Sequence, residues 1–315
     1  MRPIAAAPLA IAFLFVSGGL AADEPQSDQP APELETHPDR GFVFEGYAQG
    51  TMTAGADFDD GIGEFQYTEF IAGIKANRLV GDSGLLSIDF NAGLINYDIT
   101  PSATSVVGDA ANIGDEFDNI TVLSLTGIYA NQSTAKSAWF VGGGVFVGSE
   151  NGADFGDSVD WMFTGGYKHK VTDKLELGLG VAVRTRLDDS VLIVPVPQIT
   201  YRIDEYWSIT GQGIGAKINY KASDSLDYGI SGQYESTTFR LDDTHSAAPE
   251  GMVTHQRFPI AFYAKYQPND TIEISGRVGG LLAGELEILD TNGNDLTRQD
   301  IDTAIFGSIN LSFKF

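Results

Sequence analysis

The sequence contains no cysteine among its 315 residues. This absence excludes a disulfide framework, a thiolate metal site and a cysteine nucleophile. Basic residues are also scarce, because 19 Lys and Arg stand against 43 Asp and Glu, which gives a formal net charge of −24. Such a charge repels phosphate groups and therefore argues against a nucleic-acid partner.

Long hydrophobic runs are absent from most of the chain. After residue 41, none approaches the roughly 20 apolar residues that a membrane-spanning helix needs. Only the start of the chain is continuously apolar, where Met1-Arg2 precedes an apolar stretch over residues 4–16 and small residues at 19–21. This order is typical of a secretory signal peptide, so we predict that residues 1–21 are removed after Ala21 on export.

Residues 22–41 have a different composition from the rest of the chain. They are rich in Pro, Asp and Glu and contain almost no large apolar side chain. A segment of this kind cannot bury enough apolar surface to fold, so we predict a disordered linker. The folded domain is then expected over residues 42–315.

Alternation with a period of two residues dominates this domain. In the last segment, Ile305, Ile309, Leu311, Phe313 and Phe315 share one parity, while small and polar residues hold most of the other. This pattern predicts a β-strand with one apolar face. The same alternation occurs over residues 159–168, 175–184, 226–235, 257–266 and 272–283.

Two features favour a membrane barrel over a soluble sandwich. The alternating segments run for about 12 to 16 residues, whereas strands of soluble proteins usually have 5 to 6. Aromatic residues also gather beside tight turns, where an interfacial girdle belongs: Tyr167, Tyr201, Trp207, Tyr220 and Tyr266. Because only a closed barrel crosses lipid without exposing a hydrogen-bonding edge, we predict an all-β fold, an antiparallel up-and-down transmembrane β-barrel.

The connections between the segments are of two kinds. Short turns carry basic residues, and longer acidic loops are expected over residues 55–63, 101–118, 149–157, 242–253 and 290–302. Bacterial outer-membrane barrels have short turns on the periplasmic side and long loops outside. The pattern therefore predicts a location in the outer membrane of a Gram-negative bacterium.

About 14 strands are predicted, and one pair of them decides the count. The expected strands are 42–53, 65–77, 84–97, 119–130, 137–148, 158–170, 174–186, 191–203, 207–212, 214–221, 226–240, 255–267, 271–288 and 303–315. Arg-Leu-Asp-Asp occurs at 186–189 and again at 240–243, each time where a strand leads into a loop. Placing both copies on the extracellular side of the membrane requires the chain to reverse between residues 207–212 and 214–221. Six residues rise only about 20 Å, less than the roughly 25 Å apolar band, so a count of 12 stays open.

The chain ends in Gly-Ser-Ile-Asn-Leu-Ser-Phe-Lys-Phe over residues 307–315. This segment resembles the C-terminal strand signal that the barrel-assembly machinery reads in bacterial outer-membrane proteins. The resemblance implies that Leu311, Phe313 and Phe315 form the assembly signal. Residues 239–243, 248–251 and 279–285 resemble an uncharacterised outer-membrane β-barrel family, over roughly residues 190–315, and this likeness implies no particular activity.

Charges of both signs lie on the polar faces of the expected strands. The candidates to line the lumen are Glu176, Arg184, Arg186, Arg240, Arg257, Glu273, Arg277 and Glu285. In a confined interior such charges either line a water-filled path or pair with one another and close it. The sequence is compatible with both a water-filled path and a closed interior.

The function expected first is passive, porin-like passage of small solutes. A non-conducting structural or surface-interaction barrel that uses its acidic loops is the alternative. A hydrolase at the rim, using His245 and His255, is the third, but no nucleophile motif supports it. We therefore expect no enzyme activity, cofactor, metal or nucleic-acid partner, and a monomer in contact with membrane lipid and lipopolysaccharide.

Overall fold

The computed structural model describes residues 41–59, 63–101, 119–188, 190–245 and 248–315. The predicted signal peptide, and the predicted linker up to residue 40, lie outside these residues. The one helical element among them is the short 3-10 helix η1 (Gly156–Ser158). In the described ranges no helix is long and apolar enough to cross a membrane.

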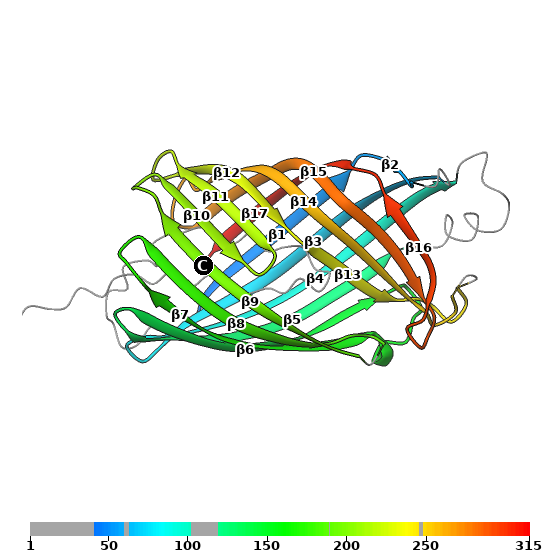
Figure 1. Ribbon diagram of the computed structural model, residues 1–315, viewed down its shortest axis with the longest axis horizontal. Helices are drawn as coiled ribbons and strands as arrows, with labels where there is room; N and C mark the ends of the chain where they lie inside the picture. The colour runs from blue at the N-terminus through cyan, green and yellow to red at the C-terminus, as the bar shows by residue number, and fades with distance from the viewer. Residues whose placement is uncertain (1–40, 60–62, 102–118, 189, 246–247) are drawn as a thin grey trace, which may run out of the picture.

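All strand segments belong to one sheet that closes into an antiparallel 14-strand β-barrel (Figure 1). The segments are β1 (Val43–Thr53), β2 (Ala56–Asp57), β3 (Gly63–Val80), β4 (Gly84–Pro101), β5 (Ile120–Thr134), β6 (Ser137–Ser149), β7 (Val159–Lys170), β8 (Leu175–Thr185), β9 (Val191–Arg202), β10 (Trp207–Gln212), β11 (Gly215–Lys221), β12 (Leu226–Gln233), β13 (Glu235–Arg240), β14 (Met252–Tyr266), β15 (Ile272–Leu289), β16 (Asp295–Ile301) and β17 (Ala304–Lys314). Three of the 17 segments are continuations: β2 extends β1 along β3, β13 extends β12 along β14, and β16 leads into β17 along β15.

The first and last strands close the barrel. β1 pairs with β3 on one side and with β17 on the other. At the end of this seam, the Phe315 N–H donates to the Phe44 carbonyl at 2.9 Å, and the Phe44 N–H donates to the Phe315 carbonyl at 3.1 Å. The closed, antiparallel architecture predicted from the sequence is confirmed.

The prediction of 14 strands, with a reversal between β10 and β11, is also confirmed. These two strands form a hairpin in which Gly211 lies opposite Ala216. Gly213 in its turn has φ of 55°, a backbone conformation that glycine adopts without steric cost. In contrast, the prediction of a continuous loop over 290–302 is wrong, because residues 295–301 form β16 and pair with β15.

The barrel has two parts whose polarity is opposite. We call the half that ends in the short turns and carries Phe315 the lower part, and the half that ends in the longer loops the upper part. In the lower part of β3, Phe70 and Ile74 are exposed on the outside, whereas Lys75 is buried inside. In its upper part the pattern reverses, with Phe65 and Tyr67 buried inside.

Strand length explains this change. β3 and β4 each have 18 residues. At about 3.3 Å per residue and a tilt of roughly 40°, such a strand rises about 45 Å, far beyond the roughly 25 Å apolar band of a membrane barrel. The upper part therefore stands in water, where the hydrophobic effect drives apolar side chains inward.

A belt of exposed large apolar side chains surrounds the lower part. It includes Phe70, Ile74, Phe90, Leu94, Leu125, Val141, Val145, Phe163, Leu179, Val181, Ile199, Ile218, Ile230, Phe262, Ile274, Val278, Ile309 and Leu311. Below the belt, Tyr167, Tyr201, Trp207 and Tyr266 are also exposed. A continuous surface of this size is unfavourable in water and fits a lipid environment.

The upper part encloses a hydrophobic core. Its members come from β2 to β5, from β13 to β17, and from the segments that follow β2 and β13: Ala56, Phe58, Phe65, Tyr67, Ile95, Tyr97, Ile99, Ile120, Val122, Phe239, Leu241, Ala248, Val253, Ala261, Leu281, Leu286, Ile288, Ile301, Ala304 and Phe306. We call this cluster the upper core. It occupies the interior of the barrel at the end that carries the long loops.

Candidate lumenal site

A buried ion pair lies at the base of the upper core. Glu235 on β13 and Arg257 on β14 are directly opposite each other in the ladder. The Arg257 Nε donates to Glu235 Oε2 at 2.8 Å, and both side chains are buried. Cross-strand pairing at this register therefore places both charges inside the barrel.

Aromatic rings surround this pair. The Arg257 guanidinium lies 4.9 Å from the centroid of the Tyr67 ring, which is cation–π geometry. His255, 1% exposed, has Nδ1 3.2 Å from Arg257 Nη1 and 3.3 Å from the Tyr97 hydroxyl. The Phe65, Tyr67 and Tyr97 rings pack edge-on against the imidazole at centroid distances of 5.2 to 5.6 Å. The core thus holds the ion pair in a fixed orientation.

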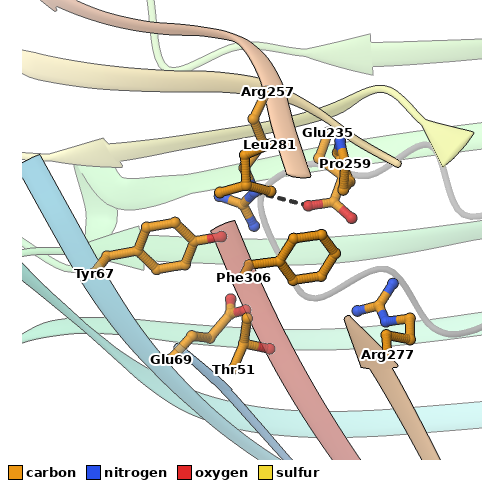
Figure 2. A pocket seen from close by; sticks show the side chains of 9 residues that line it. All are labelled: Thr51, Tyr67, Glu69, Glu235, Arg257, Pro259, Arg277, Leu281 and Phe306. Carbon is orange, nitrogen blue, oxygen red and sulfur yellow. Dashed lines mark hydrogen bonds and ion pairs between the residues drawn. The ribbon is translucent and has the colours of Figure 1, made fainter. Parts of the chain in front are cut away.

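A small cavity lies beside the pair (Figure 2). Its empty space is about 240 Å³, part of it open to solvent, and Thr51, Tyr67, Glu69, Glu235, Arg257, Pro259, Arg277, Leu281 and Phe306 line it. Figure 2 shows Glu69 and Arg277 on different sides of this space, with Phe306 between them. Only about 10 Å³ of this space admits the centre of a water molecule, which is room for about one water.

Two charged groups at the cavity lack an ion-pair partner. The Arg277 guanidinium lies 5.9 Å from the Phe306 ring centroid and forms no ion pair within the described part of the chain. Glu69 is buried, and its Oε1 has no hydrogen-bond partner among the described residues. A cation and a carboxylate that face the same space can orient a water molecule between them.

Three of the predicted lumen residues lie in the lower part, each in a pair. Glu176 is 3.6 Å from Lys168 Nζ, and Glu273 is 3.5 Å from Lys265 Nζ. Arg184 donates a hydrogen bond to Asp160 and lies over the Phe146 ring. Sequence reasoning identified one partner of each pair as a lumen candidate. The other partner depends on the register between neighbouring strands.

Arg240 lies at the upper rim and binds loops. Its guanidinium donates to the carbonyls of Asp157 at 3.1 Å, Leu187 at 2.8 Å and Glu250 at 2.9 Å. Since these carbonyls belong to three different connections, Arg240 joins them at the top of the barrel.

Arg186 lies in the connection between β8 and β9, with its Nε 3.9 Å from Asp188 Oδ2. Partial burial of Asp188 opposes ionisation. Hydrogen bonds from Ser190 and the charge of Arg186 outweigh it and hold the pKa of this carboxyl below its usual value.

Glu285 does not share the face of Arg277, although simple alternation predicts that it does. The ladder between β14 and β15 shifts register after Gln256, and Ala283 adopts φ of 48°. This bulge exchanges the two faces, so Leu286 and Ile288 enter the upper core. Glu285 instead accepts a hydrogen bond from Gln256 Nε2 at 3.1 Å and lies 4.0 Å from Arg298.

Sequence reasoning missed the aromatic filling of the upper part. A signal for it exists in β3, where Phe65 and Tyr67 alternate with polar Gln66 and Thr68. At Phe70 the apolar residues move to the other parity. This change of phase marks the level at which the outside of the barrel passes from water to lipid.

No family model matches the sequence, and no curated protein matches it. The solved structures to which the chain is similar include bacterial outer-membrane β-barrel channels and porins. An outer membrane channel from Pseudomonas putida F1 has 11% identity and a TM-score of 0.49, over 89% of this chain and 97% of that one. The toluene transporter TodX of P. putida has 11% identity and a TM-score of 0.42, over 89% and 91%. The NanC porin has 9% identity and a TM-score of 0.38, over 86% and 100%.

Proposed function

We propose that this protein is an outer-membrane β-barrel that allows passive passage of small solutes. The closed barrel and its apolar belt support insertion in a bilayer, which strands cross only when every backbone edge is paired or otherwise satisfied. Short turns at one end and longer loops at the other support an orientation with the lower end in the periplasm.

Unpartnered polar groups inside the barrel carry this proposal. Buried side-chain atoms of Glu69, Asn91, Gln198, Ser275 and Asn310 have no hydrogen-bond partner within the described protein. By strand alternation all five face inward. Because an unsatisfied buried polar group costs roughly 1 to 3 kcal/mol, these groups need water or a polar solute, which a wet lumen supplies.

A non-conducting barrel is the second candidate, and two observations favour it. Most inward charges of the lower part pair across strands, and the upper core fills the other end. In this state the axial path is narrow. No observation favours a rim hydrolase, because His255 lies inside the barrel rather than in an exposed rim site.

Reversal potential in a planar bilayer distinguishes the two candidates. Arg277→Ala removes a cation that faces the cavity without an ion-pair partner, so a conducting barrel shifts toward cation preference while its stability is nearly unchanged. Arg298→Ala is the matched control, since Arg298 pairs with Glu287 and is half-exposed. No current from wild type or variant, with clear loss of thermal stability in Arg277→Ala, contradicts the channel and supports the closed barrel.

A further inference from the structure

Strand pairing is incomplete on one side of the barrel wall. The β10–β11 hairpin has only 6 and 7 residues in its two strands. As a result, β10 pairs with β9 only from Gln198 to Arg202, and β11 pairs with β12 only up to Gln233. Above the hairpin, no described strand pairs with this side of β9, and Figure 1 shows the hairpin ending about halfway along the barrel.

The exposed edge of β9 carries two prolines. The Gly213 N–H donates to the Pro197 carbonyl at 2.9 Å, so the Pro197 backbone points toward the hairpin side. Backbone groups in a strand alternate between its two edges, so Pro195 points to the same side. Neither residue has an N–H, and unpaired N–H groups in lipid cost several kcal/mol each. The sequence thus lowers the cost of leaving this edge unpaired, and it also prevents another strand from adding there.

The opposite border is β13, which leaves the wall. On the side away from β14, its one ladder contact is the parallel pair of Arg240 with Ser149 on β6. The Glu150 N–H donates to the Arg240 carbonyl at 2.8 Å. The Thr238 carbonyl is also so near Gly148 that a Cβ there would lie 2.5 Å from it. β13 therefore crosses inside β7, β8 and β9, and diverges from β9 above the hairpin tip.

Exposure on both faces of β9 agrees with a break in the wall. Ile193, which faces outward, is 66% exposed, and Ile214 at the hairpin tip is 65% exposed. Leu192 lies opposite the inward Arg184 and so faces inward, yet it is 44% exposed. Val196, inward and near the level of the hairpin tip, is 2% exposed. The inner face of β9 is therefore accessible to solvent above the hairpin tip and closed beside it.

We propose that the stretch of wall between β9 and β13, above the β10–β11 hairpin, is a lateral opening for small, largely apolar molecules. Leu192, Ile193 and Ile214 form an apolar border to this opening, near the upper edge of the apolar belt. A charged solute would lose its hydration there. The unpartnered amide of Gln198 lies just inside and can bind a single polar group. The upper core narrows the axial path at the loop end, which favours a side route for apolar molecules.

This inference rests on the proposed passive channel and names its route and solute class. The absence of native cysteine allows the route to be closed with a crosslink. In the double variant Ile193→Cys, Ser236→Cys, one thiol lies on each border of the opening. A reducible bis-maleimide then joins the borders. The control variant Val278→Cys, Ile305→Cys places both thiols on the outside of the paired β15–β17 wall.

Two measurements separate this inference from the proposed function. Entry of the apolar dye N-phenyl-1-naphthylamine is followed in cells that carry the protein, and ion current is recorded from the purified protein. We expect the β9–β13 crosslink to lower dye entry to the level of cells without the protein, the control crosslink to leave it unchanged, and reduction of the linker to restore it. Ion current is expected to stay the same with the β9–β13 crosslink, with the control crosslink and after reduction of the linker.

Two results overturn the lateral opening: dye entry that persists after a crosslink verified on a gel, or wild-type entry no faster than in cells without the protein. If no ion current is recorded but the crosslink still blocks dye entry, the ion path of the proposed function is contradicted and the lateral opening is not. Uncrosslinked double variants that match wild type in both assays show that the substitutions themselves do not disturb folding.

Discussion

Ion pairs differ in how much they stabilise the barrel, according to where they lie. Arg257 and Glu235 are buried at 2.8 Å inside the barrel, whereas Lys221 and Asp224 lie 3.0 Å apart in an exposed turn. The interior pair has lost its water, so each charge depends on the other. The turn pair keeps its water and depends little on its partner.

Glu235→Ala is therefore expected to destabilise the barrel by about 3 to 5 kcal/mol, because it leaves the Arg257 guanidinium buried without its carboxylate. The free energy of unfolding can be followed in detergent by the gel-mobility difference between folded and heated protein. Asp224→Ala is the control, with an expected loss below about 1 kcal/mol. Equal losses in the two variants contradict the buried position of the interior pair.

The outward residues Val181 and Thr100 test where the lipid ends. Val181 belongs to the apolar belt of the lower part, and Thr100 is exposed on the upper part of β4. Val181→Arg is expected to cost roughly 2 to 4 kcal/mol, since arginine is unfavourable at the midplane of a barrel. Val181→Leu and Thr100→Arg are expected to change stability little. A similar loss for Thr100→Arg places lipid around the upper part and contradicts the two-part description.

At the scale of elements, most of the fold could be predicted from the sequence. Period-two alternation located the strands, and the break of phase at Gly211 to Gly213 located the hairpin, because each strand exposes one face to lipid. The bulge at Ala283 could not be predicted, since Gly284 and its neighbours fit either face. For the same reason the positions of Glu285 and the partners of Arg184 and Glu176 depended on register, which alternation leaves undetermined.

The last strand supports a prediction about assembly. Leu311 and Phe313 are exposed on the outside of β17, and Phe315, directly after this strand, is exposed too. Phe315 stacks on Phe44 with 6.0 Å between ring centroids. Phe315→Asp is expected to reduce the amount of assembled barrel sharply without affecting export across the inner membrane. Fractionation and the heat-dependent mobility shift measure the two steps separately.

Phe44→Ala is the matched control for this experiment, because it removes the same ring stacking but keeps the terminal aromatic residue. It is expected to assemble nearly as well as wild type. If both variants lose assembly to the same degree, the stacking at the seam, rather than a terminal recognition signal, explains the effect of Phe315.

At the scale of the whole molecule, the long strands combine two environments in one wall. Below Glu69 the outside of the barrel is apolar, as in membrane barrels, and the inside combines paired charges with a smaller apolar cluster of Ile128, Ala130, Phe140, Phe146, Met162, Ala182 and Val196. Above it the same strands follow the rule for soluble proteins and enclose a core. β13 links the narrow axial path to the side opening. It contributes Phe239 to the upper core, and it also leaves the barrel wall beside β9.

Removing part of the upper core is therefore expected to open the axial path. Tyr97 and Phe239 stack with 5.7 Å between ring centroids and are both buried in this core. The double variant Tyr97→Ala, Phe239→Ala deletes two rings from the closed end, so single-channel conductance is expected to rise above that of wild type. Met252→Ala is the control, because Met252 packs with Leu187 and Leu289 in a separate cluster. A large-to-small change there costs about 2 to 5 kcal/mol of stability without widening the lumen. Equal conductance in the double variant and the control, with both barrels folded, shows that the upper core does not limit the axial path.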